Sequence, residues 1–191
     1  MTRQARADRP FRTMPRLFLG LEIPPAPTDA LSDLQTGLRD VRWIDPGDFH
    51  VTLRFIGDIS PSEADDLAET LAASPRKRPT VALGELSTFG GMKPRSLYAS
   101  VARDDRLVAL ADHLERLCRR LGHRAETRRF TPHVTLARLN AATDIGHLAR
   151  WLSRHGALNH PPFVAERLAL YSARESVGGG PYRVEMTFPF L

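Results

Sequence analysis

The sequence contains only one cysteine, Cys118, and only two lysines, Lys77 and Lys93, among 191 residues. A single thiol cannot form an internal disulfide. No apolar run approaches the roughly 20 residues that a membrane-spanning helix needs, and the stretch Leu17–Leu21 is interrupted by Glu22 and lacks a signal-peptide cleavage pattern. These absences exclude a disulfide-stapled scaffold and an integral membrane protein, and they predict a cytoplasmic location.

Acidic residues are fewer than basic ones, 22 against 27, and the chain therefore has a formal net charge of +5. A basic surface is compatible with a polyanionic partner such as RNA. Arginine supplies all basic residues except the two lysines, which points to coding bias, and part of the excess lies in the first 16 residues. We predict that residues 1–15 are a disordered basic extension, with Met14 as an alternative start, and that residues 16–191 form one domain. Charge alone leaves RNA binding and a merely solvated basic surface equally open.

The tetrapeptide His-Val-Thr-Leu is present twice, at His50–Leu53 and at His133–Leu136. Each copy lies in a segment with the pattern of a strand, whose side chains alternate between two faces. Histidine and threonine therefore share one face of each strand, and valine and leucine share the other. A strand that places an imidazole and a hydroxyl on its polar face is not using that face for packing, so this face is a candidate site.

The surrounding sequence predicts helices and strands in a repeated order. Apolar spacing and capping residues predict helices over Thr28–Leu38, from Ser60 to about Ala73, over Arg106–Leu121 and over Ile145–His155. Alternation and β-branched residues predict strands over Arg16–Ile23, His50–Ile56, Val81–Phe89, Ser96–Ala102, Pro132–Leu139, Phe163–Tyr171 and Tyr182–Phe188.

The step in residue number from His50 to His133, called the motif offset below, also relates other landmarks of the chain. It carries Leu31–Leu38 onto Leu114–Leu121, and it carries the helix start at Ser60 onto Thr143. An internal duplication explains this repetition. We therefore predict an α+β, bilobal duplicated fold: two antiparallel sheets with outer helices around a central groove, related by a pseudo-twofold axis.

Two histidines on opposite sides of a groove are the minimum equipment for acid–base catalysis on a phosphate held between them. Imidazoles with pKa values near about 6.5 hold opposite protonation states around neutral pH. Thr52 and Thr135, two residues along on the same faces, can donate hydrogen bonds to non-bridging phosphate oxygens. The histidines handle the protons, so this chemistry demands no metal and no cofactor. As zinc ligands two histidines are too few, and no cysteine or carboxylate repeats at a matching spacing.

Two arginines near the motifs are candidates to bind the phosphate. Arg54 lies four residues after His50 and therefore shares its face in an ideal strand. Arg138 lies five residues after His133 and faces away unless the strand contains a bulge or has ended. For both arginines the competing interpretation is a side chain that simply reaches solvent.

With these residues in place, the chain resembles the two-histidine phosphoesterase superfamily. It is similar in particular to the bacterial and archaeal RNA 2′,3′-cyclic phosphodiesterases, once named 2′-5′ RNA ligases. The similar segments are Arg42-Trp43 through Pro46, the run His50–Gly57, the run Pro132–Arg138 and Gly180-Pro181-Tyr182, and the resemblance covers about Pro15 to Leu191.

The resemblance implies that the protein opens a 2′,3′-cyclic phosphate at an RNA 3′ end and leaves a 2′-phosphate. It implies that His50 is the proton donor to the departing 3′ oxygen, that His133 is the proton acceptor that activates water, and that Thr52, Thr135 and Arg138 bind phosphate. Where the family often has Arg-Val-Leu-Trp after an aromatic-Pro stretch, this chain has Gly90-Gly91 in the loop that follows Phe89, which leaves Phe89 as the candidate to stack on a base.

Several alternatives stay open at this point. Phe55 and Trp43 are interpreted as core or pocket wall rather than as a dedicated stacking platform. A non-catalytic module that binds RNA ends is the alternative to an enzyme, but such a module has no need of two proton-transfer groups. Within enzymes, the substrate can be an RNA end such as a tRNA fragment or a small cyclic nucleotide, and the reaction can run in reverse as 2′-5′ ligation. We expect a monomer.

Overall fold

The computed structural model describes residues 16–173 and 181–190, so the predicted extension at residues 1–15 lies outside the described residues. Along the chain the elements are β1 (Arg16–Glu22), α1 (Pro25–Ser32), β2 (Val41–Trp43), a 3-10 turn (Pro46–Asp48), β3 (His50–Asp58), α2 (Pro61–Ala73), β4 (Thr80–Val81), β5 (Leu83–Phe89), β6 (Ser96–Val101), α3 (Asp105–Arg120), β7 (His133–Leu139), α4 (Ile145–His155), β8 (Phe163–Val164), β9 (Arg167–Ala173) and β10 (Tyr182–Pro189). The predicted α+β class is confirmed, and each predicted strand is present, two of them split into a short and a long piece.

Helix ends follow the local chemistry of the chain. At the start of α2 the Ser60 hydroxyl accepts a hydrogen bond from the Glu63 amide and the Glu63 carboxylate accepts one from the Ser60 amide, the capping box that the sequence predicts. The predicted helix over Thr28–Leu38 is wrong in its bounds, because α1 begins at Pro25 and ends at Ser32. Proline fits the first turn of a helix, where its missing amide costs nothing, and Gly37 adopts a φ of 75°, which no helix accommodates.

All the strands except β4 and β8 form one long antiparallel sheet, and β4 and β8 form a separate two-stranded sheet. The order of the long sheet is β10-β9-β1-β3-β7-β6-β5, and β2 also pairs with β7. The halves β10-β9-β1-β3 and β7-β6-β5 are joined where β3 meets β7, and Val51 pairs with Val134 at that junction. The expected two sheets are therefore the two halves of one sheet, and the junction falls at the second residue of both motifs.

The predicted duplication is visible in the pairing of the short strands. Strands β4 and β8 pair with each other, Thr80 with Val164 and Val81 with Phe163, and the motif offset carries β4 onto β8. The same offset carries α2 onto α4 and β5 onto β9, with the first residues of each pair displaced by one position. The pairs β3–β7 and β4–β8 thus both join equivalent elements, as a pseudo-twofold arrangement requires.

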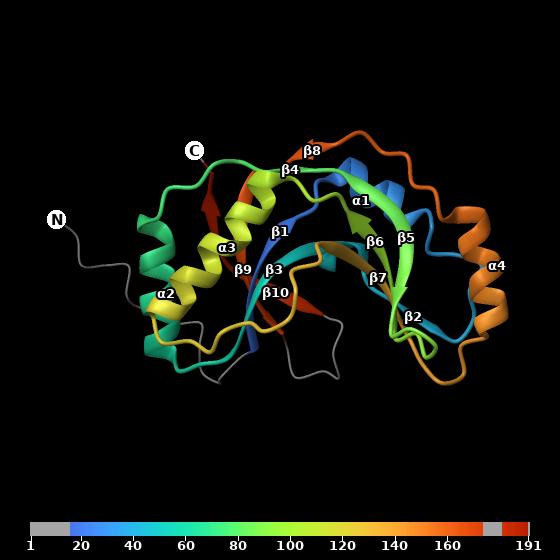
Figure 1. Cartoon of the computed structure of the whole chain (residues 1–191), viewed down its shortest axis with the longest axis horizontal. Coiled ribbons are helices and arrows are strands. Elements are labelled where there is room, and N and C mark those ends of the chain that lie inside the picture. The colour runs from blue at the N-terminus through green and yellow to red at the C-terminus, as the bar shows by residue number, and fades with distance from the viewer. Residues whose placement is uncertain (1–15, 174–180, 191) are drawn as a thin grey trace.

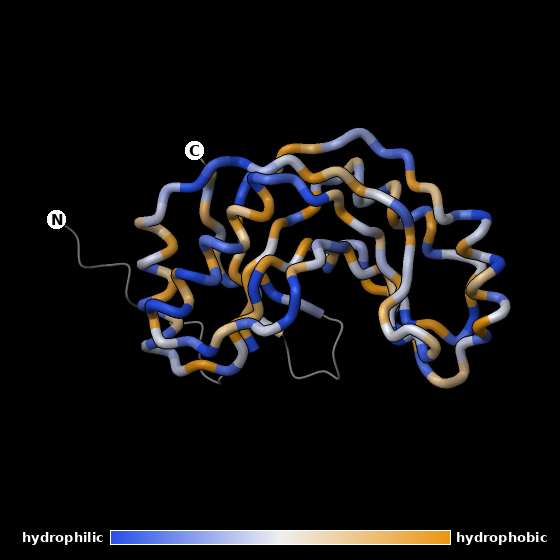
Figure 2. Tube along the Cα trace, in the orientation of Figure 1, coloured by the Kyte–Doolittle hydropathy of each residue, from blue (hydrophilic) through white to orange (hydrophobic). Residues whose placement is uncertain are grey.

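The helices lie over the two halves of an arched sheet, α2 and α3 over one half and α1 and α4 over the other, with α2 and α4 outermost (Figure 1). The main core lies between these helices and the sheet and consists mostly of leucine, including Leu19, Leu67, Leu114 and Leu136. Hydrophobic residues accordingly recur along the strands and on helix faces in Figure 2. No helix among the described residues is long and apolar enough to cross a membrane.

Candidate active site

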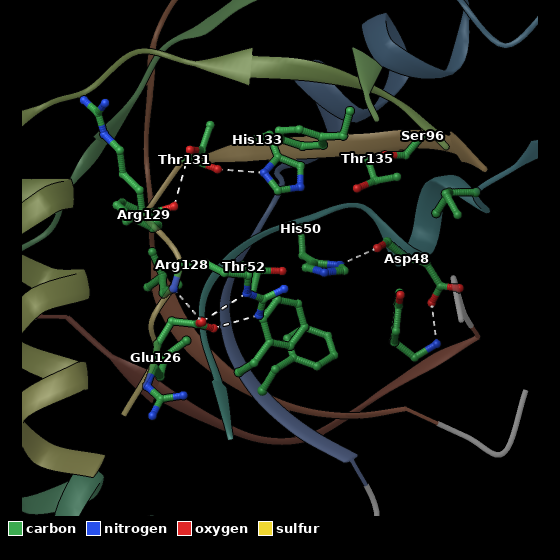
Figure 3. A pocket seen from close by; sticks show the side chains of 18 of the residues that line it. Asp48, His50, Thr52, Ser96, Glu126, Arg128, Arg129, Thr131, His133 and Thr135 are labelled. Carbon is green, nitrogen blue, oxygen red and sulfur yellow. Dashed lines mark hydrogen bonds and ion pairs between the residues drawn. The ribbon is translucent and has the colours of Figure 1, made fainter. Parts of the chain in front are cut away.

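The two motif strands lie next to each other, so the two histidines meet at the centre of the sheet. With Val51 opposite Val134, the antiparallel register places His50 opposite Thr135 and Thr52 opposite His133. These four side chains line one pocket of about 500 Å³, and Figure 3 shows the two imidazoles and the two threonines around it. The valines point to the other face and are buried.

Each imidazole is oriented by the backbone two residues before it. The Nδ1 atom of His50 lies 2.7 Å from the Asp48 carbonyl oxygen, and Nδ1 of His133 lies 2.7 Å from the Thr131 carbonyl oxygen (Figure 3). A carbonyl can only accept a hydrogen bond, so both Nδ1 atoms donate. The neutral tautomer of each ring therefore keeps its proton on Nδ1 and leaves Nε2 as the basic nitrogen.

His50 lies among aromatic rings of the first half of the sheet. Its ring centroid is 4.8 Å from that of Phe18, 5.0 Å from that of Tyr182 and 5.2 Å from that of Tyr171. Burial disfavours a positive charge and, with smaller effects of His133 and Arg138, lowers the pKa of His50 to about 4. In the ligand-free pocket this imidazole is neutral at pH 7.

His133 has fewer aromatic neighbours. Phe89 and Tyr98 contact its ring edge-on, at centroid distances of 4.8 and 5.3 Å. Burial and the charge of Arg138 lower the pKa of His133 below its usual value, with the hydrogen bond to Thr131 acting in the opposite direction. Phe89 itself stacks on Tyr98 with the centroids 4.0 Å apart, so one face of the ring proposed for a base is already covered.

Arg138 faces the pocket because β7 contains a bulge. Leu97 pairs with Ala137 and Tyr98 pairs with Thr135, which leaves Leu136 as the extra residue. The extra residue reverses the alternation, so Arg138 joins the histidine and threonine face and lines the pocket. Its Nε is buried and makes no hydrogen bond. A buried donor of this kind is costly to leave unpaired, so Arg138 is ready for an anionic ligand.

The same bulge in β3 turns Arg54 away. Leu19 pairs with Arg54 and Gly20 pairs with Thr52, so Leu53 is the extra residue. The ideal-strand expectation that Arg54 shares a face with His50 is therefore wrong. Although Arg54 borders the pocket, its side chain is only 4% exposed, and its guanidinium donates to the Glu115 carboxylate and to the Arg124 carbonyl oxygen.

Phe55 takes the groove-side position that Arg54 was expected to have. The motif offset makes Phe55 the equivalent of Arg138, and both follow the extra residue of their bulge by two positions. Phe55 is 47% exposed and lines the pocket, which agrees with its interpretation as pocket wall. Its ring centroid lies 5.8 Å from that of Phe18.

Sequence reasoning missed one wall of the pocket, the segment between α3 and β7. Glu126, Arg128 and Arg129 of this segment line the pocket together with Thr131. The segment has neither helical nor strand periodicity, and its arginines are indistinguishable in sequence from the many others. Their nearness to the second motif is the one signal that could have found them.

The described residues contain no group of three or more histidine, cysteine, aspartate or glutamate side chains arranged to hold a metal ion. Cys118 is buried, and burial raises the pKa of its thiol to about 11. This thiol is therefore protonated and unreactive at neutral pH. The side chains in the pocket that are suited to proton transfer near neutral pH are the two imidazoles.

Comparison with known proteins agrees with this geometry. The family model described as LigT-like phosphoesterase matches residues 21–98 and again residues 100–182. An RNA 2′,3′-cyclic phosphodiesterase of Bacillus subtilis is 27% identical over 169 residues, which cover 85% of this chain and 86% of that protein. One of Aeropyrum pernix is 32% identical over 118 residues, covering 61% of this chain and 67% of that protein.

Solved structures show the same fold. A crystal structure of a phosphoesterase superimposes with a TM-score of 0.72 at 19% identity, covering 93% of this chain and 99% of that chain. The crystal structure of E. coli LigT complexed with 3′-AMP has a TM-score of 0.69 at 18% identity, covering 92% of this chain and 98% of that chain.

Proposed function

Because the chain belongs to the LigT-like phosphoesterase family, we propose that it is an RNA 2′,3′-cyclic phosphodiesterase that hydrolyses the cyclic phosphate to a 2′-phosphate without a metal. The curated relatives from B. subtilis and A. pernix carry that name. The single observation that carries the proposal is the pair of imidazoles on adjoining strands, each with Nδ1 fixed by a backbone carbonyl and Nε2 left for the substrate.

The reaction needs one proton removed and one delivered. Nε2 of His133 takes a proton from water, whose oxygen attacks phosphorus. The bond from phosphorus to the ribose 3′ oxygen breaks on the opposite side, and Nε2 of His50 delivers a proton to that oxygen. The phosphate stays on the 2′ oxygen, and the two rings exchange protonation states, which solvent restores.

The substrate itself supplies the charge that His50 needs in order to act as the acid. In the empty pocket burial holds the pKa of His50 near 4. An anionic phosphate placed between the imidazoles favours their protonated forms and raises both pKa values. The pocket thus couples protonation of His50 to the arrival of the substrate.

Arg138 and the two threonines bind the non-bridging oxygens. Arg138 offers a buried Nε that has no partner, and the hydroxyls of Thr52 and Thr135 lie on the same face as the histidines. Charge on these oxygens increases in the pentavalent transition state, so donors aimed at them strengthen as the reaction proceeds.

A pocket of about 500 Å³ is of the size that holds a single small ligand. The unit recognised is accordingly the terminal cyclic nucleotide, whether it ends an RNA such as a tRNA fragment or is free. We propose that the protein acts as a monomer. The protein carries one cysteine and so needs no oxidising compartment, which supports a cytoplasmic enzyme.

The test is product analysis on a short RNA that ends in a 2′,3′-cyclic phosphate, in the presence of a chelator. Phosphorus NMR should show a 2′-phosphate as the product. A predominantly 3′-phosphate product would reverse the donor and acceptor roles of the two histidines, and the absence of hydrolysis would refute the proposed activity. Adding an RNA with a free 5′-hydroxyl tests ligation in the same reaction.

A further inference from the structure

Arg128 is the second arginine in the pocket, and its surroundings differ from those of Arg138. Its Nε and Nη2 donate to the two carboxylate oxygens of Glu126, at 3.0 and 2.7 Å, and its backbone amide also donates to Glu126. Figure 3 shows the pair on the wall of the pocket. These bonds hold the pKa of Glu126 at about 2, so its carboxylate is ionised at all relevant pH values. The charge of Arg128 is therefore already neutralised by a bidentate partner.

Phe55 lies beneath the Arg128 guanidinium, with Cζ 5.2 Å from the ring centroid. The Arg128 side chain is nevertheless 72% exposed. Carboxylate on one edge and aromatic ring on one face leave the second flat face of the guanidinium open on the pocket. A guanidinium fixed in this way is a rigid plate rather than a mobile charge.

The segment between α3 and β7, which contains Arg128, is hydrogen-bonded to β3 and α3. Arg54 donates to the Arg124 carbonyl oxygen and to Glu115, and Glu115 accepts a hydrogen bond from the Glu126 amide at 3.3 Å. The contacts thus run from Arg54 through Glu115 and Glu126 to Arg128 and return to Phe55, the neighbour of Arg54. Both the Glu126 carboxylate and the Phe55 ring that contact Arg128 are thus connected to β3, the strand that bears His50.

We propose that the open face of Arg128, backed by Phe55 and held by Glu126, is the stacking surface for the nucleobase of the terminal nucleotide. This inference rests on the proposed function and names the base-binding part of the same site. Single-stranded RNA bases stack on aromatic rings and on arginine planes, and such stacking tolerates any base because every base has a flat face. Arg138 takes the phosphate because it is unpaired, and Arg128 takes the base because it is paired and flat.

The decisive variant is Arg128→Lys, which keeps the charge but removes the plane. It is assayed with adenosine 2′,3′-cyclic phosphate and with the methyl riboside 2,3-cyclic phosphate, which has no base. We expect the KM for the adenosine substrate to rise by about 5- to 100-fold, the range that base stacking supports, with kcat unchanged and with the baseless substrate unaffected. Phe55→Leu should act in the same direction, and Arg119→Lys, an exposed change on the outer helix α3, is the control.

An equal rise in KM for both substrates would overturn the proposal, since it would mean that Arg128 acts on the phosphate. Unchanged KM values for both would overturn it as well. Calorimetric binding of 2′-AMP and ribose 2-phosphate gives a readout that needs no turnover: wild-type protein should prefer 2′-AMP, and Arg128→Lys should lose that preference. If the protein hydrolyses neither cyclic substrate, the proposed function fails while this binding comparison still decides on the stacking surface.

Discussion

The two halves of the sheet carry the same motif on the same kind of strand, yet they present different chemistry to the pocket. Each motif strand contains a bulge, at Leu53 and at Leu136, and these positions are again related by the motif offset. The residue that each bulge turns toward the pocket is Phe55 in the first half and Arg138 in the second. The duplicated backbone supplies two proton-transfer groups, and the divergent side chains give the groove a phosphate side and an apolar side.

The halves also treat their histidines differently. His50 has aromatic contacts on several sides and the more strongly lowered pKa, whereas His133 has Phe89 and Tyr98 as edge-on neighbours. Two equivalent imidazoles have no reason to take different roles. Unequal burial separates their pKa values in the empty pocket and makes His50 the ring that is harder to protonate, so the donor role proposed for His50 depends on the charge of the bound phosphate.

Removing either imidazole should have the largest effect and tests whether both halves are catalytic. General acid and general base catalysis contribute about 10²- to 10⁴-fold each, so His50→Ala and His133→Ala should each lower kcat by at least that order. The measurement is single-turnover hydrolysis of a cyclic-phosphate RNA, with unchanged circular dichroism as the control for folding. Activity close to wild type in either variant would reduce the site to a single histidine and refute the paired mechanism.

The second prediction concerns the divergent positions. Arg138→Gln removes the unpaired buried donor, and loss of one donor to developing charge costs about 10²- to 10³-fold in kcat. Phe55→Gln at the equivalent position touches no reacting atom and should change KM instead of kcat. Steady-state kinetics on one mononucleotide substrate separates the two outcomes. If both variants lower kcat by the same factor, Phe55 and Arg138 do not have the different roles that their positions after the two bulges indicate.

Much of the difference between the two halves can be predicted from the sequence, and the features that cannot be predicted have physical reasons. The motif strands and the Ser60 helix start follow from alternation and capping, which are local properties. The bulges are not local: Leu53-Arg54 and Leu136-Ala137 have no glycine or other turn residue, so the sequence carries no sign that alternation is broken there. The ideal-strand prediction for Arg54 is wrong for this reason.

The wall between α3 and β7 was unpredictable for a different reason. Arg128 acquires its position from a carboxylate two residues away, from the ring of Phe55 and from the buried pair of Arg54 with Glu115. These partners come from three separate parts of the chain. Only the folded structure shows that they meet.

The third prediction tests Arg54 as a structural residue. Arg54→Met leaves the partly buried Glu115 without its ion pair and the Arg124 carbonyl without its donor. Breaking a buried pair on one side costs about 3–5 kcal/mol, and because Glu115 is 25% exposed on its side we expect the lower end, about 3 kcal/mol of unfolding free energy. Urea denaturation measures it, and the double variant with Glu115→Leu should recover part of the loss. A stable Arg54→Met protein with a large loss of kcat would instead place Arg54 in the catalytic machinery.

The smallest expected effect is a displacement of the pH optimum, and it tests the assignment of unequal burial. Both imidazoles have lowered pKa values in the free protein, that of His50 to about 4. The plot of kcat/KM against pH reports the free enzyme and needs one neutral and one protonated ring, so both limbs of its bell should lie below the ordinary value of about 6.5. The plot of kcat reports the complex, in which the anionic phosphate favours the protonated rings, so its bell should lie at higher pH.

The lowered pKa of His50 also makes stability depend on pH. Between pH 4 and 6.5 the folded state binds fewer protons than the unfolded chain, so the free energy of unfolding falls as the pH falls through that window. His50→Gln should remove that part of the fall.

Two variants test whether the two histidines differ in burial. Phe18→Ser opens the aromatic surroundings of His50 to water and should move one limb of the kcat/KM profile toward higher pH, whereas Phe89→Ser in the other half should move it less. Equal shifts in the two variants would mean that the two histidines are equally buried, and the difference between the halves would then rest on Phe55 and Arg138 alone.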